Sequence, residues 1–133
     1  MSILDPHVAE VLVNNILSRN DGILSTSIID MKGNILATKS KEDFKETVGV
    51  TQKGEKYGVT LVASVLSLIQ LARNAIQEAK AVITIHENGK LVLLPLPSLQ
   101  ILVGLIVQRS INTEDYDFAN NIERLVVDTL WRI

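Results

Sequence analysis

The most apolar part of the chain is an uncharged run of eighteen residues, LVLLPLPSLQILVGLIVQ, over residues 91–108. A run of this length is a candidate for a membrane-spanning helix. Pro95 and Pro97 argue against a helix, because each would remove a hydrogen bond and clash with the preceding turn. The run is also rich in Val, Ile and Leu, which suits buried strands. It therefore predicts two sheet strands joined by a turn, with no membrane insertion.

The residues before this run complete a predicted meander. Asn88-Gly89 lies between two apolar segments, and this dipeptide favours a two-residue type I′ hairpin because both residues tolerate positive φ. We expect strands over 81–87 and 90–94 to pair antiparallel, and a third strand to cover 101–109.

The first forty residues predict a helix followed by another hairpin. Asp5 caps the helix and Pro6 suits its first position. The hairpin strands cover 23–29 and 34–38. In the turn between them, Gly33 takes the left-handed conformation and Asp30 hydrogen-bonds the turn backbone.

The remaining segments are a polar loop and two helices. Residues 40–57 predict the loop, with a short helical turn near 42–47. Asn112 or Thr113 caps the final helix. A long helix is predicted over 58–80. The resulting order, α-β-β-α-β-β-β-α in one domain over 1–133, indicates the α+β class, an antiparallel sheet with helices on its faces.

The long helix over 58–80 has more apolar surface than one sheet face can cover. Its apolar residues span roughly 220° of the helical wheel, against ~100° for an ordinary one-sided helix. Val65, Ala72 and Ile76 mark the centre of this arc. Either the 40–57 loop covers the excess, or the helix forms a subunit interface.

Composition narrows the function. Hydrophobic residues make up 47% and charged residues 21%, which indicates a globular domain. A net charge of −2 and 4% aromatic residues argue against nucleic-acid partners. The sequence has no cysteine, so disulfides and thiolate catalysis are excluded. The first residues lack the features of a secretion signal, and we expect a cytoplasmic protein.

No catalytic, cofactor-binding or metal-binding residues emerge. His7 and His86 have no partner at metal-ligand spacing. The loop over 49–58 resembles a phosphate-binding loop only in its glycine spacing, and Glu55 stands where the lysine is needed. The carboxylates are spread along the surface and no serine lies in a nucleophile elbow. We therefore expect neither an enzyme nor a cofactor.

Three segments resemble the roadblock family, first named from dynein light chains. They are the hairpin GILSTSIIDMKGNILATKS, the helix GVTLVASVLSLIQLARNA and the meander AVITIHENGKLVLLPLPSLQILVGLIV. The resemblance covers roughly residues 5–130 and implies a five-stranded sheet with helices on both faces, as in the related longin and profilin folds. It also implies a scaffold or regulator of a small Ras-like GTPase, which pairs with itself or with a roadblock paralogue.

The resemblance further implies where the dimer forms. Family members pack the long helix against its partner and join the third strands into one sheet. The expected interface residues here are Leu61, Leu68, Leu71, Ala75, Val82, Thr84 and His86. Arg73 is a weaker candidate for contact with a partner, and nothing identifies an arginine finger. The alternative is a small-ligand sensor or carrier of longin-like or profilin-like fold, which needs a pocket lined by converging polar groups.

Overall fold

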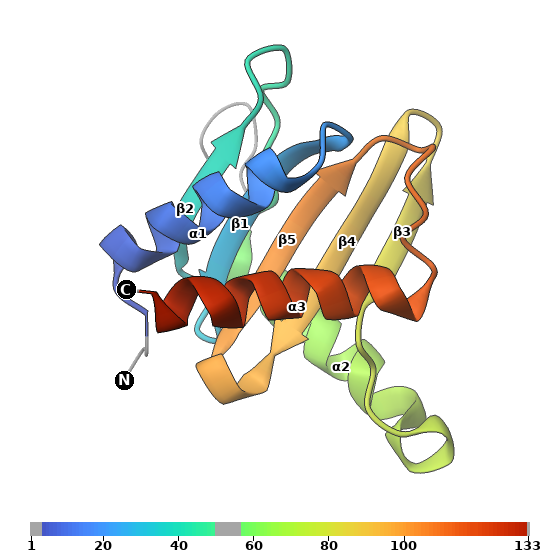
Figure 1. Cartoon of the computed structure of the whole chain (residues 1–133). Coiled ribbons are helices and arrows are strands. Elements are labelled where there is room, and N and C mark those ends of the chain that lie inside the picture. The colour runs from blue at the N-terminus through green and yellow to red at the C-terminus, as the bar shows by residue number, and fades with distance from the viewer. Residues whose placement is uncertain (1–3, 50–56, 133) are drawn as a thin grey trace.

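The computed structural model describes residues 4–49 and 57–132, and the element order over this part agrees with the predicted one (Figure 1). Residues 50–56 lie outside the described residues. They include most of the 49–58 loop, whose glycine spacing resembles that of a phosphate-binding loop. The elements are α1 (Pro6–Arg19), β1 (Ile23–Asp30), β2 (Ile35–Ser40), α2 (Gly58–Ile76), β3 (Val82–His86), β4 (Gly89–Leu96), the 3₁₀ turn η1 (Pro97–Leu99), β5 (Ile101–Val107) and α3 (Tyr116–Trp131).

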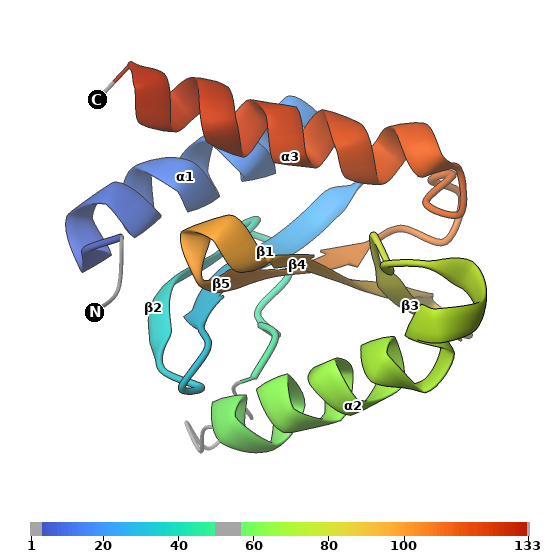
Figure 2. The same cartoon turned by 90° about the horizontal axis from the view of Figure 1, so that it is seen from below.

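The strands form one antiparallel sheet in the order β2-β1-β5-β4-β3. Helices α1 and α3 cover one face of this sheet and α2 crosses the other, as Figure 2 shows. The apolar run over 91–108 becomes β4, η1 and β5, in which most residues are buried. Its hydrophobicity therefore reflects burial on both faces of a sheet, as predicted.

The two faces have separate cores of unequal size. The first core lies under α1 and α3 and includes Leu12, Ile16, Ile28, Leu105 and Val126. The second core lies under α2 and consists of Ile29, Val48, Val62, Val65, Ile69, Leu93 and Leu102. Each fully buried side chain of this kind contributes about 1.5–3 kcal/mol, so the larger first core supplies more of the hydrophobic stabilisation.

The predicted start of α1 and the first hairpin turn are confirmed. Asp5 caps α1 by accepting a hydrogen bond from the Val8 N–H at 2.9 Å. In the β1–β2 turn, Asp30 Oδ1 accepts from the backbone N–H groups of Lys32 and Asn34, each at 2.9 Å. Gly33 has a φ of 90°, the left-handed conformation expected there.

The turn between β3 and β4 differs from the prediction. The loop residues are Glu87 and Asn88, and β4 already begins at Gly89. None of these three residues has a positive φ, so the turn is not of type I′. Gly89 is required for a different reason. A Cβ there would lie 2.8 Å from the Val107 carbonyl oxygen of the neighbouring strand.

Helix α2 ends four residues earlier than predicted, and its last turns are not covered by the sheet. Gln77 has a φ of 71°, which stops the helix. The side chains that enter the second core are Val62, Val65 and Ile69, whereas Ile76 is 75% exposed. The predicted centre of the apolar arc is therefore buried at Val65 and exposed at Ile76, because the last turns of α2 extend beyond the sheet (Figure 1).

Two local predictions are corrected. The residue that caps α3 is Asp115, whose carboxylate accepts from the Asp117 N–H, and not Asn112 or Thr113. No helical turn forms at 42–47. A single turn closed by the Phe44 N–H and the Lys41 carbonyl stands there instead.

A buried lysine anchors the connection from β5 to α3. Lys90 Nζ donates to the Ile111 carbonyl at 2.7 Å and to Glu114 Oε2 at 3.0 Å. The hydrogen bond from Lys90 lowers the pKa of Glu114, which stays ionised and compensates the ammonium group. This pair ties the start of α3 to β4.

The start of α2 touches the β1–β2 turn through two glycines. A Cβ on Gly58 would overlap the Gly33 carbonyl oxygen, and a Cβ on Gly33 would overlap the backbone of Val59. Only residues without side chains allow this approach. The contact fixes how closely α2 lies against the sheet.

Thr26 offers a test of the first core. Its side chain is fully buried, and Oγ1 has no hydrogen-bond partner among the described residues. Because this hydroxyl loses its water without compensation, Thr26→Val should raise the free energy of unfolding by about 1 kcal/mol. The neighbouring Ser27→Ala should lower it by about 1 kcal/mol, because Ser27 Oγ hydrogen-bonds Thr38 Oγ1 at 2.7 Å. Urea unfolding at one protein concentration measures both, and a Thr26→Val protein less stable than wild type contradicts the assignment.

Asp30 makes the hairpin turn sensitive to acid. Burial raises the pKa of Asp30, but hydrogen bonds from Asn34 and Lys32 outweigh it, so the net pKa is lowered. The carboxylate thus adds stability above its unfolded pKa of about 3.9, and this contribution is lost as pH falls through the lower folded pKa. Asp30→Asn should lower the free energy of unfolding at pH 7 by about 1–2 kcal/mol, and less at pH 3. A difference from wild type that stays the same from pH 7 to pH 3 would contradict this account.

Candidate functional surface

One flank of α2 presents uncovered apolar side chains. Leu68 is 51% exposed and Leu71 is 81% exposed, while Leu61 is half-buried beside the second core. Ala75, one turn after Leu71, is exposed as well. Val62 and Ile69, at the other side of the arc, are buried against the sheet. The expected interface residues of α2 therefore share the flank that the sheet leaves open.

Strand β3 places the other expected interface residues at an edge of the sheet. Val82, Thr84 and His86 alternate onto the face that α2 covers, where Val82 packs against the second core. Thr84 and His86 are exposed, and Thr84 Oγ1 lies 2.7 Å from His86 Nε2. Because β3 is the last strand in the sheet order, no strand of the described residues neighbours one side of its backbone.

A groove of about 790 Å³ lies between the open flank of α2 and the β3–β4 hairpin. Its floor is the part of the sheet that α2 does not cover, with Leu24, Leu91 and Ile106. Leu61 and Ser64 form the helix side, and His86 lies on the hairpin side. The helix flank, the groove and the free edge together form one continuous surface, here called the α2–β3 surface.

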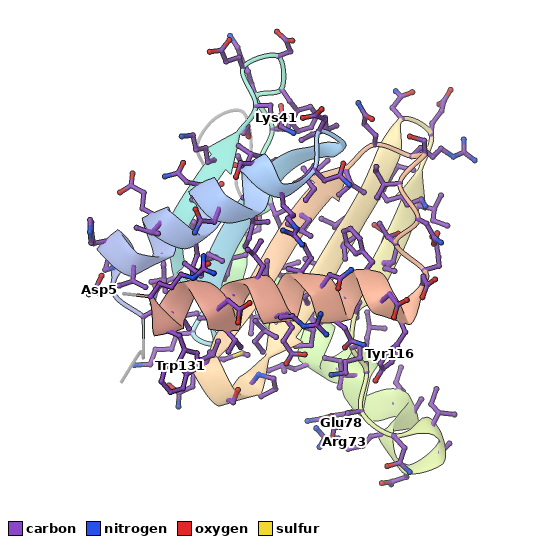
Figure 3. The ribbon with its side chains drawn as sticks, in the orientation of Figure 1. Asp5, Lys41, Arg73, Glu78, Tyr116 and Trp131 are labelled. Atoms are coloured by element: carbon purple, nitrogen blue, oxygen red, sulfur yellow. The ribbon has the colours of Figure 1, made fainter. Side chains whose placement is uncertain are left out.

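Arg73 lies in the last turn of α2, away from the sheet (Figure 3). Its guanidinium forms a two-pronged ion pair with Glu78, with Nε 2.8 Å from Oε1 and Nη2 3.1 Å from Oε2. Both side chains are at least half exposed, so the pair contributes little to stability. Arg73 is accessible to a partner, although Glu78 neutralises part of its charge.

The described residues contain no cluster of histidine and carboxylate side chains that could hold a metal ion. His7 is exposed in the first turn of α1, far along the chain from His86. The pKa values of Asp30 and Glu114 are shifted by contacts that hold a turn and the start of a helix together. The hydrogen bonds that shift these two pKa values thus stabilise the fold.

Sequence reasoning missed two parts of this surface. Ile85 is 60% exposed on the opposite face of β3, because it lies past the cover of α3 while Ile83 still packs against the first core. The sequence did carry a signal for this, because Ile85 is an apolar residue next to the polar residues of the hairpin turn. The groove had no such signal, because its floor combines residues from three distant strands.

By length and composition, α2 is also a helix that could cross a membrane. In this fold it instead supplies Val62, Val65 and Ile69 to the second core. Removing α2 into a bilayer would expose that core to water, at a cost of about 1.5–3 kcal/mol for each uncovered side chain. In this fold these three side chains belong to the core of the domain itself.

Comparisons with known proteins identify the fold. No protein-family model matches the sequence, and no curated protein matches it. Among solved structures, the roadblock/LC7 domain from Streptomyces avermitilis aligns with a TM-score of 0.59 at 11% identity, covering 91% of this chain and 93% of that chain. The gliding protein MglB from Thermus thermophilus aligns with a TM-score of 0.60 at 13% identity, covering 96% of this chain and 93% of that chain.

A profilin has a similar architecture. LokiProfilin1, solved in a complex with rabbit actin, aligns with a TM-score of 0.54 at 11% identity and covers 98% of both chains. Identities this low establish the arrangement of the backbone and leave function open. The chain has the fold of roadblock domains, an α+β fold to which profilins are similar.

Proposed function

We propose that the protein is a non-catalytic homodimer that regulates or scaffolds a small Ras-like GTPase through protein surfaces. The observation that carries the proposal is the α2–β3 surface, where an exposed apolar helix flank lies beside a free strand edge. The roadblock fold agrees with the family resemblance, which implies this role.

The α2–β3 surface supports dimerisation on physical grounds. Leu68 and Leu71 are large apolar side chains on adjacent turns, and such contiguous exposure on a soluble domain marks an interaction site. A free edge strand next to it would invite uncontrolled pairing unless a defined partner occupied it. A second copy meets both requirements with the same surface, as a two-fold interface demands.

A role through surfaces also fits the chemistry of the described residues. They contain no group of His, Asp and Glu side chains that could hold a metal ion. Arg73 is an exposed cation in the last turn of α2, and we assign it to contact with the GTPase. A scaffold needs this kind of accessible side chain and no reaction centre.

The groove favours a second candidate, a small-ligand sensor or carrier. Its volume of about 790 Å³ lies in the range of ligand pockets, and Thr60, Ser64 and His86 add polar groups to an apolar lining. The two candidates differ in assembly state. A carrier keeps the groove open in a monomer, whereas the dimer closes it with protein.

Leu71→Glu tests the dimer. The side chain is 81% exposed, so the monomer should fold normally, while a buried charge in the interface should weaken dimerisation about 100-fold or more. Val59→Glu is the matched control, because Val59 is 69% exposed on the opposite flank of α2. Light scattering over a dilution series measures the assembly. A wild-type mass near 14.6 kDa at every concentration would refute the dimer, and equal weakening by both variants would refute this interface.

The GTPase role is tested with the Ras-like GTPase encoded nearest to this protein's gene. We expect the dimer to retain that GTPase in one nucleotide state, loaded with GDP or with a GTP analogue, and Arg73→Ala to weaken the retention about 10-fold. Co-elution and a binding titration measure it. A dimer that binds neither state of any Ras-like GTPase from the same genome would refute the regulatory role.

A further inference from the structure

A cavity of about 380 Å³ lies where the connection from α2 to β3 passes the C-terminal end of β4 and the first half of α3. It shares no lining residue with the groove of the α2–β3 surface. Leu94, Leu96 and Ala119 line it, and all three belong to the first core. The cavity therefore opens onto the end of that core, and its lining is complete within one copy of the chain.

The backbone of β4 offers this cavity a hydrogen-bond acceptor. Only two residues separate His86 from Gly89, so these two form the hydrogen-bonded pair that closes the hairpin, and every second residue from Gly89 onward directs its backbone toward β3. This series reaches Leu93 and then Pro95, but β3 begins only at Val82, opposite Leu93. Pro95 has no N–H, so its carbonyl oxygen alone faces the side where no β3 residue stands. Outside the sheet ladders, no described backbone N–H donates to this buried residue, and a buried acceptor needs a donor.

Two ion pairs of unequal quality stand at the rim of the cavity. Arg73 Nε lies 2.8 Å from one Glu78 oxygen and Nη2 lies 3.1 Å from the other, so this pair is held at two points. Lys80 and Glu123 are joined by a single contact of 3.3 Å, with side chains 40% and 41% exposed. The second pair contributes little to stability and opens at little cost. The ring of Tyr116, 5.8 Å from Lys80 Nζ, keeps the ammonium group beside the cavity.

We propose that this cavity binds a free α-amino acid with an apolar side chain. Such a molecule carries a carboxylate and an ammonium group on one carbon atom, so it can enter between Lys80 and Glu123 and pair with both. Lys80 takes the carboxylate, while Glu123 and the Pro95 carbonyl oxygen take the ammonium group. The apolar side chain packs against Leu96 and Ala119 at the end of the first core. The volume lies near the lower end of the range for ligand pockets, which suits a ligand of this size.

Calorimetric titration of the full chain with L-leucine tests the site. We expect saturable binding of one molecule per chain. Isocaproate has the same carbon skeleton without the ammonium group, and isoamylamine has it without the carboxylate. Each should bind about 10-fold more weakly or worse, because each leaves one charged group of the site without its partner.

Two variants assign the charged groups. Lys80→Met and Glu123→Gln should each weaken the binding of L-leucine about 10-fold or more, because each removes one of the two charges that the ligand contacts. Lys39→Met is the matched control, since Lys39 is also an exposed lysine and bonds Asn14 at the other edge of the sheet. It should bind L-leucine as wild type does. Circular dichroism should show all three variants folded, because none of the replaced side chains is buried.

The absence of saturable L-leucine binding up to about 10 mM would overturn the proposal. Equal affinity for isocaproate or for isoamylamine would overturn recognition through both charges. Equal weakening by Lys39→Met and Lys80→Met would overturn the assignment to this cavity. These results are independent of the proposed function, because Lys80 and Glu123 belong neither to the α2–β3 surface nor to the proposed GTPase contact.

Discussion

A sheet with apolar side chains on both faces has to be covered on both, and the described part of this chain divides its helices unequally between them. Helices α1 and α3 cover one face together, while α2 crosses the other, where Val48 of the preceding segment joins it in the second core (Figure 2). One helix is too narrow for a five-stranded face. The uncovered part of the sheet becomes the groove, and the uncovered part of the helix becomes the open flank. Both features arise because α2 is narrower than the sheet face against which it packs.

The order and type of the elements could be predicted because their signals are local. Asp5-Pro6 caps α1, and Asp30 with Gly33 closes a turn, through contacts within a few residues. The errors occurred where contacts with residues far along the chain determine the local structure. Gly89 reads as a turn residue, but it is needed because β5 passes close to it. In each such case the partner lies far along the chain.

The candidate surface was predictable in part for the same reason. The wide apolar arc, centred on Val65, Ala72 and Ile76, indicated an excess face, but the pattern alone did not decide between its two flanks. The position of the sheet, which buries Val62 and Ile69, decides how much of each flank stays exposed. Periodicity within one helix carries no information on where its neighbour ends. Ile85 and the groove were missed because they depend on the extent of α3 and α2.

The contact between Gly33 and Gly58 has a consequence for how such a chain can evolve. Backbone touches backbone there, so a larger residue at one position cannot be accommodated by a smaller one at the other. Both positions are already at the lower limit of size. A side chain at either would have to lift the start of α2 from the sheet and loosen the second core. The two sites are therefore constrained jointly, and substitution at one has no local remedy.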